Sequence, residues 1–336
     1  MRDCSAMIHD DIPIDTFLPL PDHAGQSSAR RKTGIEIEFA GLSVDEAGQV
    51  VQRLWGGTIA PVDDRDLKVT GGQFGEVKVE LDISLQKKWA EDLATQALGG
   101  LVPVEVVTAP LTQEDLPQVD RLVAALRKAG ALGTRARLGY GFGLHLNPEL
   151  PAPNGAGLVE VARAYAFLED WLRHSDPIDP ARRVLPFVDP WPTALKDALA
   201  QAEGWSVAQF AQTYATHAPS RHFGLDLLPA LQHLRPDALE SVPEAHLKGG
   251  RPTFHYRLAE ARLDEAGWSV AYEWNRWCLI EAVAANARAL AELAQRWQDH
   301  RAGLLPLGSD WAAQVEGVLA RANLLALLST GTGQET

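Results

Sequence analysis

The sequence predicts an α+β fold built around a mostly antiparallel β-sheet. Segments in which apolar and polar residues alternate come in runs and hairpins, and do not alternate regularly with helices. Residues 67–70 and 76–84 are two such segments, and the glycine-rich stretch GGQFG between them is typical of a hairpin loop. Because alternate side chains of a strand point to opposite faces, each segment predicts one apolar and one polar face.

The remaining elements follow from periodicity and from capping signals. Further strands are predicted at 34–41, 104–108, 137–147 and 251–258. Ser43 and Glu46 have the spacing of a capping box before a helix over 44–54, which Gly56 and Gly57 close. Other helices are predicted at 112–128, with Gly130 at its end, and at 155–173, 194–216, 269–299 and 309–328. Residues 1–32 are interpreted as an N-terminal extension, and residues 33–330 as one domain.

Composition narrows the class of partner. The formal net charge of −13 argues against nucleic-acid binding, which requires basic residues to neutralise phosphates. The sequence contains no run of eighteen apolar residues, so no membrane span is expected. The start of the chain is acidic and the two cysteines lie far apart, which favours a reduced, cytoplasmic setting. Small molecules are therefore the expected partners, and the oligomeric state cannot be read from the sequence.

The polar faces of the predicted strands carry residues that could bind metal ions. They hold the following side chains: Glu36, Glu38, Lys78, Glu80, Asp82, Glu105, His145, Asn147, His255 and Arg257. Each pattern alone is more typical of a solvated sheet face. Together, several carboxylates on one face repel one another unless cations are bound there, and oxygen-rich sites with a few imidazoles suit Mg²⁺ or Mn²⁺. Such ions would neutralise a polyphosphate, and the glycines at 139, 141 and 143 would leave room for a flat ligand.

Six motifs occur in a characteristic order: GIEIEF, VKVELD, EVVTAPL, GFGLHLNPE, PSRHFGLDLLP and RPTFHYRL. With them the chain resembles the amidoligase family, which belongs to the wider superfamily of glutamine synthetase and γ-glutamylcysteine synthetase. The resemblance implies a glutamine-synthetase-like catalytic domain over residues 33–330, with a curved sheet and helices on one face. It also implies an ATP- and Mg²⁺-dependent (or Mn²⁺-dependent) ligase that joins a small-molecule or peptide carboxylate to an amine through an acyl phosphate.

The resemblance assigns metal ligands to several positions. Glu36 and Glu38 match the paired acidic ligands of the first motif strand, and Glu105 matches a later acidic ligand. The further candidates are Glu80, Asp82, His145 and His255. His255 stands where the superfamily commonly has a metal-binding glutamate, which makes the number of metal ions uncertain.

The resemblance also implies roles in catalysis and in binding. Arg257 matches the arginine that steadies the transferring phosphoryl group, and Asn147 lies where a phosphate is contacted. Together with Glu105 they form the predicted catalytic set, and Lys78 is a further nucleotide-binding candidate. Arg221 and Arg251 are expected to hold the substrate carboxylate, because a guanidinium binds a carboxylate through two parallel hydrogen bonds.

Three other functions remain open from the sequence. The same site could transfer a phosphoryl group to a guanidino or hydroxyl acceptor. The chain could instead be a binding protein for a nucleotide or an amino acid that has lost turnover. A metal-dependent hydrolase is a more distant alternative. For a ligase, loop 71–75 or the Pro-rich segment 176–193 would serve as a lid that excludes water from the acyl phosphate.

Overall fold

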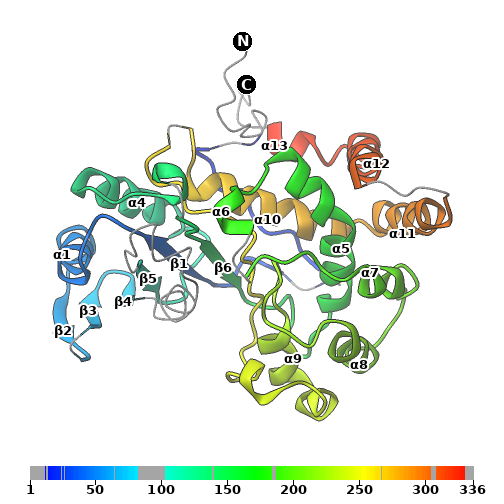
Figure 1. Cartoon of the computed structure of the whole chain (residues 1–336), viewed down its shortest axis with the longest axis horizontal. Helices are drawn as coiled ribbons and strands as arrows, with labels where there is room; N and C mark the ends of the chain where they lie inside the picture. Colours follow the sequence, from blue (N-terminus) through cyan, green and yellow to red (C-terminus); the bar gives the residue numbers. More distant parts are fainter. Residues whose placement is uncertain are drawn as a thin grey trace.

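The sheet has six strands, and every neighbouring pair is antiparallel. The computed structural model describes residue 12 and residues 14–81, 103–183, 187–303 and 308–329, apart from positions 24, 26, 64, 138, 139 and 266. The strands are β1 (Thr33–Phe39), β2 (Thr58–Pro61), β3 (Leu67–Gly72), β4 (Gly75–Leu81), β5 (Val104–Thr108) and β6 (Leu144–Pro148). Their order in the open sheet is β2-β3-β4-β5-β1-β6 (Figure 1). The predicted mixture of helices with an antiparallel sheet is confirmed.

The helices follow the predicted segments but are divided more finely. They are α1 (Val44–Trp55), α4 (Pro117–Ala129), α5 (Leu158–Ser175), α6 (Pro180–Arg183), α7 (Thr193–Leu199), α8 (Val207–His217), α9 (Leu228–Leu234), α10 (Val270–Ala285), α11 (Ala287–Ala302), α12 (Gly308–Arg321) and α13 (Ala326–Ser329). The helix predicted over 194–216 is broken between α7 and α8, where Gly204 has a φ of +72°. The helix predicted over 269–299 is broken at Asn286, whose side chain accepts a hydrogen bond from the Ala289 N–H and so starts α11.

The helix ends show where local signals succeeded. Ser43 and Glu46 form the predicted capping box of α1, and Gly56 ends that helix with a φ of 77°. Gly130 ends α4 in the left-handed region. However, α4 begins at Pro117 and not near residue 112, because proline has no N–H to donate within a helix and is favoured in its first turn.

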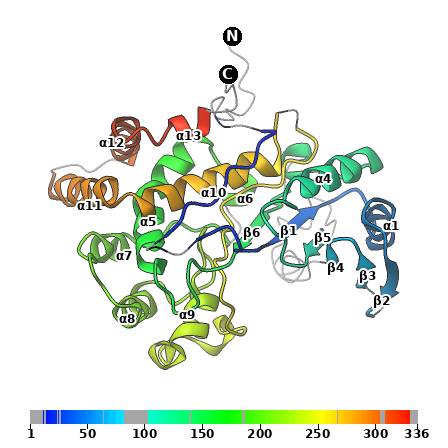
Figure 2. The ribbon, with the colours of Figure 1, turned by 180° about the vertical axis from the view of Figure 1, so that it is seen from behind.

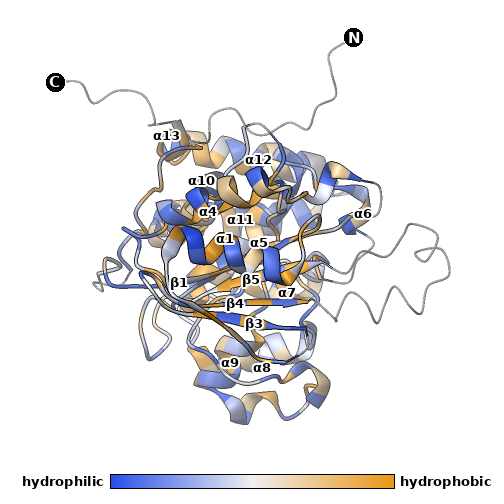
Figure 3. Cartoon of the chain, turned by 90° about the vertical axis from the view of Figure 1, so that its left-hand side faces the viewer, coloured by the Kyte–Doolittle hydropathy of each residue, from blue (hydrophilic) through white to orange (hydrophobic). Residues whose placement is uncertain are grey.

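The apolar core lies between the sheet and the helices. Ile35, Ile37 and Phe39 of β1 are fully buried. Helix α1 packs on strands β2 to β5, and α4 packs on α1 and α10. In Figure 3, α1, α4 and α10 lie above the strands, whereas α8 and α9 lie below them. The helices therefore lie on both sides of the sheet. This differs from the expectation, implied by the resemblance, that they cover one face. No helix among the described residues combines the length and the apolar character that crossing a bilayer requires.

Extended segments continue the sheet beyond β6. The strand predicted over 251–258 pairs through isolated bridges, such as Leu146 with Tyr256, and a further bridge, Gly143 with Glu260, lies just beyond it. The register slips by one residue between these two bridges, so no regular ladder forms. Among the described residues of the predicted strand 137–147, the regular strand begins at Leu144. The predicted alternation still holds, because Tyr256 is buried in the core while its neighbours face the other side.

The N-terminal segment is bound along α10. The N–H of Leu18 donates to the side chain of Asn275, and the Arg31 guanidinium pairs with the buried carboxylate of Glu281. His23 contacts the same carboxylate at 3.0 Å. Figure 2 shows this segment running beside α10. The described part of the predicted extension is thus packed against the body of the protein, and the division at residue 32 stays a prediction.

Candidate active site

Strand register brings the predicted acidic and imidazole side chains together. Glu36 of β1 lies directly opposite His145 of β6. Glu38 of β1 lies opposite Glu105 of β5, and Glu105 in turn lies opposite Glu80 of β4. Directly opposed residues of antiparallel strands have Cβ atoms about 5 Å apart. Side chains from four strands therefore converge on one face of the sheet.

We call Glu36, Glu38, Glu105, His145 and His255 the acidic cluster. His145 lies at its centre. Its Nδ1 is 2.7 Å from a carboxylate oxygen of Glu36 and 4.0 Å from one of Glu105. Its Nε2 is 3.6 Å from a carboxylate oxygen of Glu38. Two sets of three donor atoms lie within 4.8 Å of one another: Glu36, His145 and His255, and Glu38, Glu105 and His145. Both sets consist of oxygen and imidazole donors, which fits divalent cations.

His255 lies between an acidic and a basic partner. Its Nδ1 is 3.3 Å from Asp226 Oδ2, and its Nε2 is 3.1 Å from the Nε of Arg257. Asp226 is fully buried and also accepts a hydrogen bond of 2.7 Å from Arg221. Burial and the positive charge of Arg257 lower the pKa of His255 to about 4, so its ring is neutral at pH 7. A neutral imidazole can bind a metal ion.

The electrostatic environment keeps Glu36 ionised. Burial alone would raise the pKa of its carboxyl group, but the hydrogen bond and charge interaction with His145, together with the charge of Arg257, lower it well below the usual range. Asn147 supports the same carboxylate by donating a hydrogen bond of 2.9 Å. At the edge of the cluster, burial raises the pKa of Glu80, and the nearby charge of Glu36 adds to this effect.

The predicted binding residues lie at different distances from the cluster. Arg257 is half-buried, and its guanidinium lies 5.5 Å from the centre of the Phe187 ring. Lys78 is largely exposed on β4, and its Nζ is 3.9 Å from Glu80. Arg251 is exposed, and its side chain makes no hydrogen bond or ion pair with any described residue. The structure does not bring Arg251 to the cluster, so its role stays a prediction. Asp82 lies outside the described residues.

Arg182 is a residue near the site that the sequence did not single out. This buried guanidinium donates to the carbonyls of Gly141 and Arg257, at 3.1 and 2.6 Å. A Cβ atom at Gly143 would lie 2.8 Å from both terminal nitrogens of Arg182 and from Nε2 of His145. The N–H of Gly143 donates to Glu38 at 2.6 Å. The space above this glycine is thus filled by the protein's own side chains and not left for a flat ligand.

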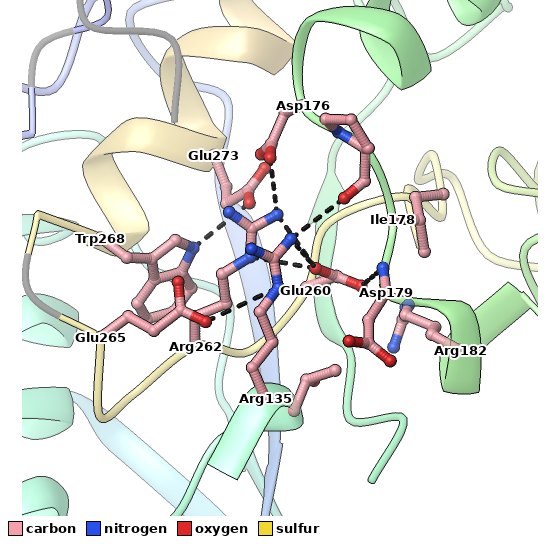
Figure 4. A network of polar contacts seen from close by, with 12 residues as sticks. Arg135, Asp176, Ile178, Asp179, Arg182, Glu260, Arg262, Glu265, Trp268 and Glu273 are labelled. Atoms are coloured by element: carbon pink, nitrogen blue, oxygen red, sulfur yellow. Dashed lines mark hydrogen bonds and ion pairs between the residues drawn. The ribbon is translucent and has the colours of Figure 1, made fainter. Parts of the chain in front are cut away.

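A network of buried ion pairs holds the element that carries Arg182 (Figure 4). Arg262 binds Asp176 at 2.8 Å and Glu260 at 3.0 Å. Glu260 also pairs with Arg135 and accepts a hydrogen bond of 2.6 Å from the N–H of Asp179. Residues 260–262 are therefore joined to the start of α6, and this connection positions Arg182 beside the acidic cluster.

Asp226 is a second site residue that the sequence analysis did not single out, although one sequence signal could have indicated it. Asp226 lies within the motif PSRHFGLDLLP, together with Arg221, which it binds. Arg182 lies in a Pro- and Asp-rich stretch without a recognisable pattern, so only the tertiary structure reveals its position.

Comparison with known families identifies the chain. A family model described as "Putative amidoligase enzyme" matches residues 29–279. The match includes the acidic cluster and the segment with His255 and Arg257. Searches of curated proteins and of solved structures returned no match. Because the match covers well over half of the sequence, the chain belongs to the amidoligase family, whose description names a ligase activity.

Proposed function

We propose that the protein is an ATP- and Mg²⁺-dependent carboxylate–amine ligase that activates its acid as an acyl phosphate. The observation that carries the proposal is the convergence of Glu36, Glu38, Glu105 and His145 on one face of the sheet. The proposal includes a glutamine-synthetase-like catalytic domain over residues 33–330, acting in the cytoplasm.

The donor set supports a metal–nucleotide site. Glu38 and Glu105 with His145 offer mainly carboxylate oxygens, and Glu80 lies beside Glu105. Such donors suit Mg²⁺ or Mn²⁺, which keep part of their hydration shell and bind phosphate oxygens. When bound, these ions neutralise the triphosphate and the charge that develops during phosphoryl transfer.

The chain's own cations and amides then act on the substrates. Arg257 would donate hydrogen bonds to the equatorial oxygens of the transferring phosphoryl group, where negative charge is spread in the transition state. Asn147 would offer an amide N–H to a phosphate oxygen, and Lys78 would contact the nucleotide from the edge of the sheet. Arg221, held by Asp226, is the better placed of the two candidates for the substrate carboxylate.

The reaction proceeds in two displacements. A carboxylate oxygen of the acid attacks the γ-phosphorus of ATP, the bond to the bridging oxygen breaks, and ADP leaves. The nitrogen of the amine then attacks the acyl carbon, phosphate leaves with the former carboxylate oxygen, and the nitrogen loses a proton. Water must be kept from the acyl phosphate, and we assign this role to loop 71–75 or segment 176–193.

The test is a coupling assay with purified protein, Mg-ATP and pools of acids and amines. ADP release that requires both an acid and an amine, with an amide product seen by mass spectrometry, is expected. Glu36→Gln and Arg257→Ala should abolish it, whereas Glu76→Gln should not, because Glu76 is an exposed carboxylate of the same sheet whose ion-pair partner is the surface residue Lys68. Circular dichroism checks that each variant is folded.

Two other outcomes would reject the ligase in favour of another function. ADP release with a stable phosphorylated guanidino or hydroxyl product, and no amide, would indicate a phosphotransferase. Tight ATP binding without ADP formation in any mixture would indicate a binding protein.

A further inference from the structure

The two donor sets of the acidic cluster differ in chemistry. One consists of two carboxylates and one imidazole, from Glu38, Glu105 and His145. The other consists of one carboxylate and two imidazoles, from Glu36, His145 and His255. Carboxylates suit Mg²⁺, whereas imidazole suits Fe²⁺, Co²⁺, Ni²⁺ or Zn²⁺. The second set therefore differs from what a magnesium ion prefers.

We propose that Glu36, His145 and His255 form a site for a nitrogen-preferring transition-metal ion, and that Asp226 orients His255 toward that ion. The inference deepens the proposed function and rests on it only in placing this ion beside the nucleotide. Binding of the ion itself does not depend on turnover.

The hydrogen bonds of His255 determine which nitrogen is available. The Nε of Arg257 can only donate, so the Nε2 of His255 accepts at 3.1 Å and carries the lone pair. In the neutral ring the proton is then on Nδ1, which faces Asp226 Oδ2 at 3.3 Å. Arg221 Nη2 is also 3.2 Å from Nδ1, but this contact joins two donors in that tautomer and is not a hydrogen bond.

This arrangement is the one found around metal-bound histidines. Such a histidine presents one nitrogen to the ion and donates its other ring N–H to a carboxylate, which sets the tautomer and the ring orientation. Asp226 is fully buried and is itself held by Arg221 at 2.7 Å. Nε2 of His255 lies 3.9 Å from a carboxylate oxygen of Glu36. Asp226 and Glu36 thus lie near the two different nitrogens of the His255 ring, Nδ1 and Nε2 respectively.

His145 supplies the second imidazole from the opposite strand. Its Nδ1 and Glu36 Oε2 are 2.7 Å apart, which is hydrogen-bond distance. The rings of His145 and His255 are 5.4 Å apart and nearly perpendicular. A divalent ion bound by both atoms would replace this contact.

Arg257 competes with the ion for His255. Its Nε occupies the lone pair of Nε2, so the guanidinium must turn away when the ion binds. The same movement frees the guanidinium for a phosphate. Removing this side chain should therefore strengthen metal binding, which a merely structural role of Arg257 would not produce.

The test uses tag-free, metal-free full-length protein without nucleotide, so that it is independent of ligation. Zn²⁺ affinity is measured by competition with a chromogenic chelator, and Mg²⁺ affinity by calorimetry. His255→Glu should lower Zn²⁺ affinity at least about 10-fold and raise Mg²⁺ affinity, because a carboxylate replaces an imidazole. Asp226→Asn should lower Zn²⁺ affinity by about 10–100-fold, the usual effect of losing an orienting partner. Arg257→Ala should raise it.

His174→Gln is the matched control, because His174 is exposed and lies outside the cluster. It should leave Zn²⁺ affinity unchanged. X-ray absorption at the zinc edge provides a measurement that needs no variant, and it should show two imidazoles bound to the ion in the wild type. In His255→Glu it should show one.

The inference is overturned if the wild type binds zinc through one imidazole or none. It is also overturned if His255→Glu binds Zn²⁺ as tightly as the wild type. The two proposals fail separately. Ligation with Mg-ATP but no zinc site refutes only this inference. A zinc site with two imidazoles but no ligation in any mixture refutes only the proposed ligase.

Discussion

Substituting Gly143 by alanine tests how tightly the chain is packed behind the acidic cluster. The added Cβ would lie 2.8 Å from both terminal nitrogens of Arg182 and from Nε2 of His145. Neither side chain can move freely, because Arg182 donates to two backbone carbonyls and His145 is bound to Glu36. The substitution therefore forces a buried guanidinium or the central histidine out of place.

The expected cost combines two effects. Inserting a methyl group into a well-packed interior costs about 1–3 kcal/mol. Weakening one hydrogen bond from a charged donor adds about 1.5 kcal/mol or more. We expect Gly143→Ala to lower the free energy of unfolding by about 3 kcal/mol, as the sum of these effects. Displacement of His145 should also lower Zn²⁺ affinity about 10-fold or more.

The assay is urea unfolding of the metal-free protein, followed by circular dichroism. Gly34→Ala is the control, because Gly34 lies on β1 beside Asn147, where a Cβ would meet its nearest atoms at 3.7 and 3.8 Å. These are ordinary van der Waals distances, so this variant should be within about 1 kcal/mol of the wild type. If Gly143→Ala loses no more stability than Gly34→Ala, Arg182 is not held as the structure indicates and the reasoning fails.

Three further predictions concern other parts of the chain. Arg31→Met removes the guanidinium that pairs with the fully buried Glu281. It should lower the free energy of unfolding by about 3–5 kcal/mol. Adding Glu281→Gln should recover part of this loss, and no recovery would contradict the ion-pair explanation. Burial raises the pKa of Asp120 to about 6, although this carboxylate caps the start of α10. The stability that this raised pKa contributes is therefore full below about pH 4 and is lost as the pH rises through about 6. Parallel stability–pH curves for the wild type and Asp120→Asn would contradict this expectation. Arg221→Ala should raise the KM for the acid at least about 10-fold. Arg251 lies at an exposed position outside the cluster, so Arg251→Ala should leave the KM unchanged. The opposite result would indicate that the acid binds along residues 251–253.

The structure also shows how a histidine is accommodated at position 255, where the resemblance implied a glutamate. Asp226 and Arg221 surround Nδ1 of His255, and Arg257 occupies its Nε2. A carboxylate at this position would face Asp226 without a proton to share, and the two charges would repel each other. His255 and the buried Asp226 therefore form one hydrogen-bonded pair.

The sequence by itself determined which side chains share a face. Glu36 and Glu38 point away from the core because side chains in a strand alternate, and this period depends only on local backbone geometry. Capping is equally local, so the ends of α1 and the end of α4 at Gly130 were predicted correctly. The six ordered motifs indicated the family, and the family match over residues 29–279 confirmed it.

Only the tertiary structure decided which of these faces meet. β1 lies between β5 and β6, which come from distant parts of the chain, and the register sets Glu36 against His145. Alternation leaves strand order and register open, because both depend on long-range packing of the apolar faces. Arg182 could not be placed for the same reason, because it acts through contacts with residues 41 and 75 positions away in sequence, which no local pattern encodes. The motif that contains Asp226 indicates its local partner Arg221, but not its contact with His255, 29 positions away.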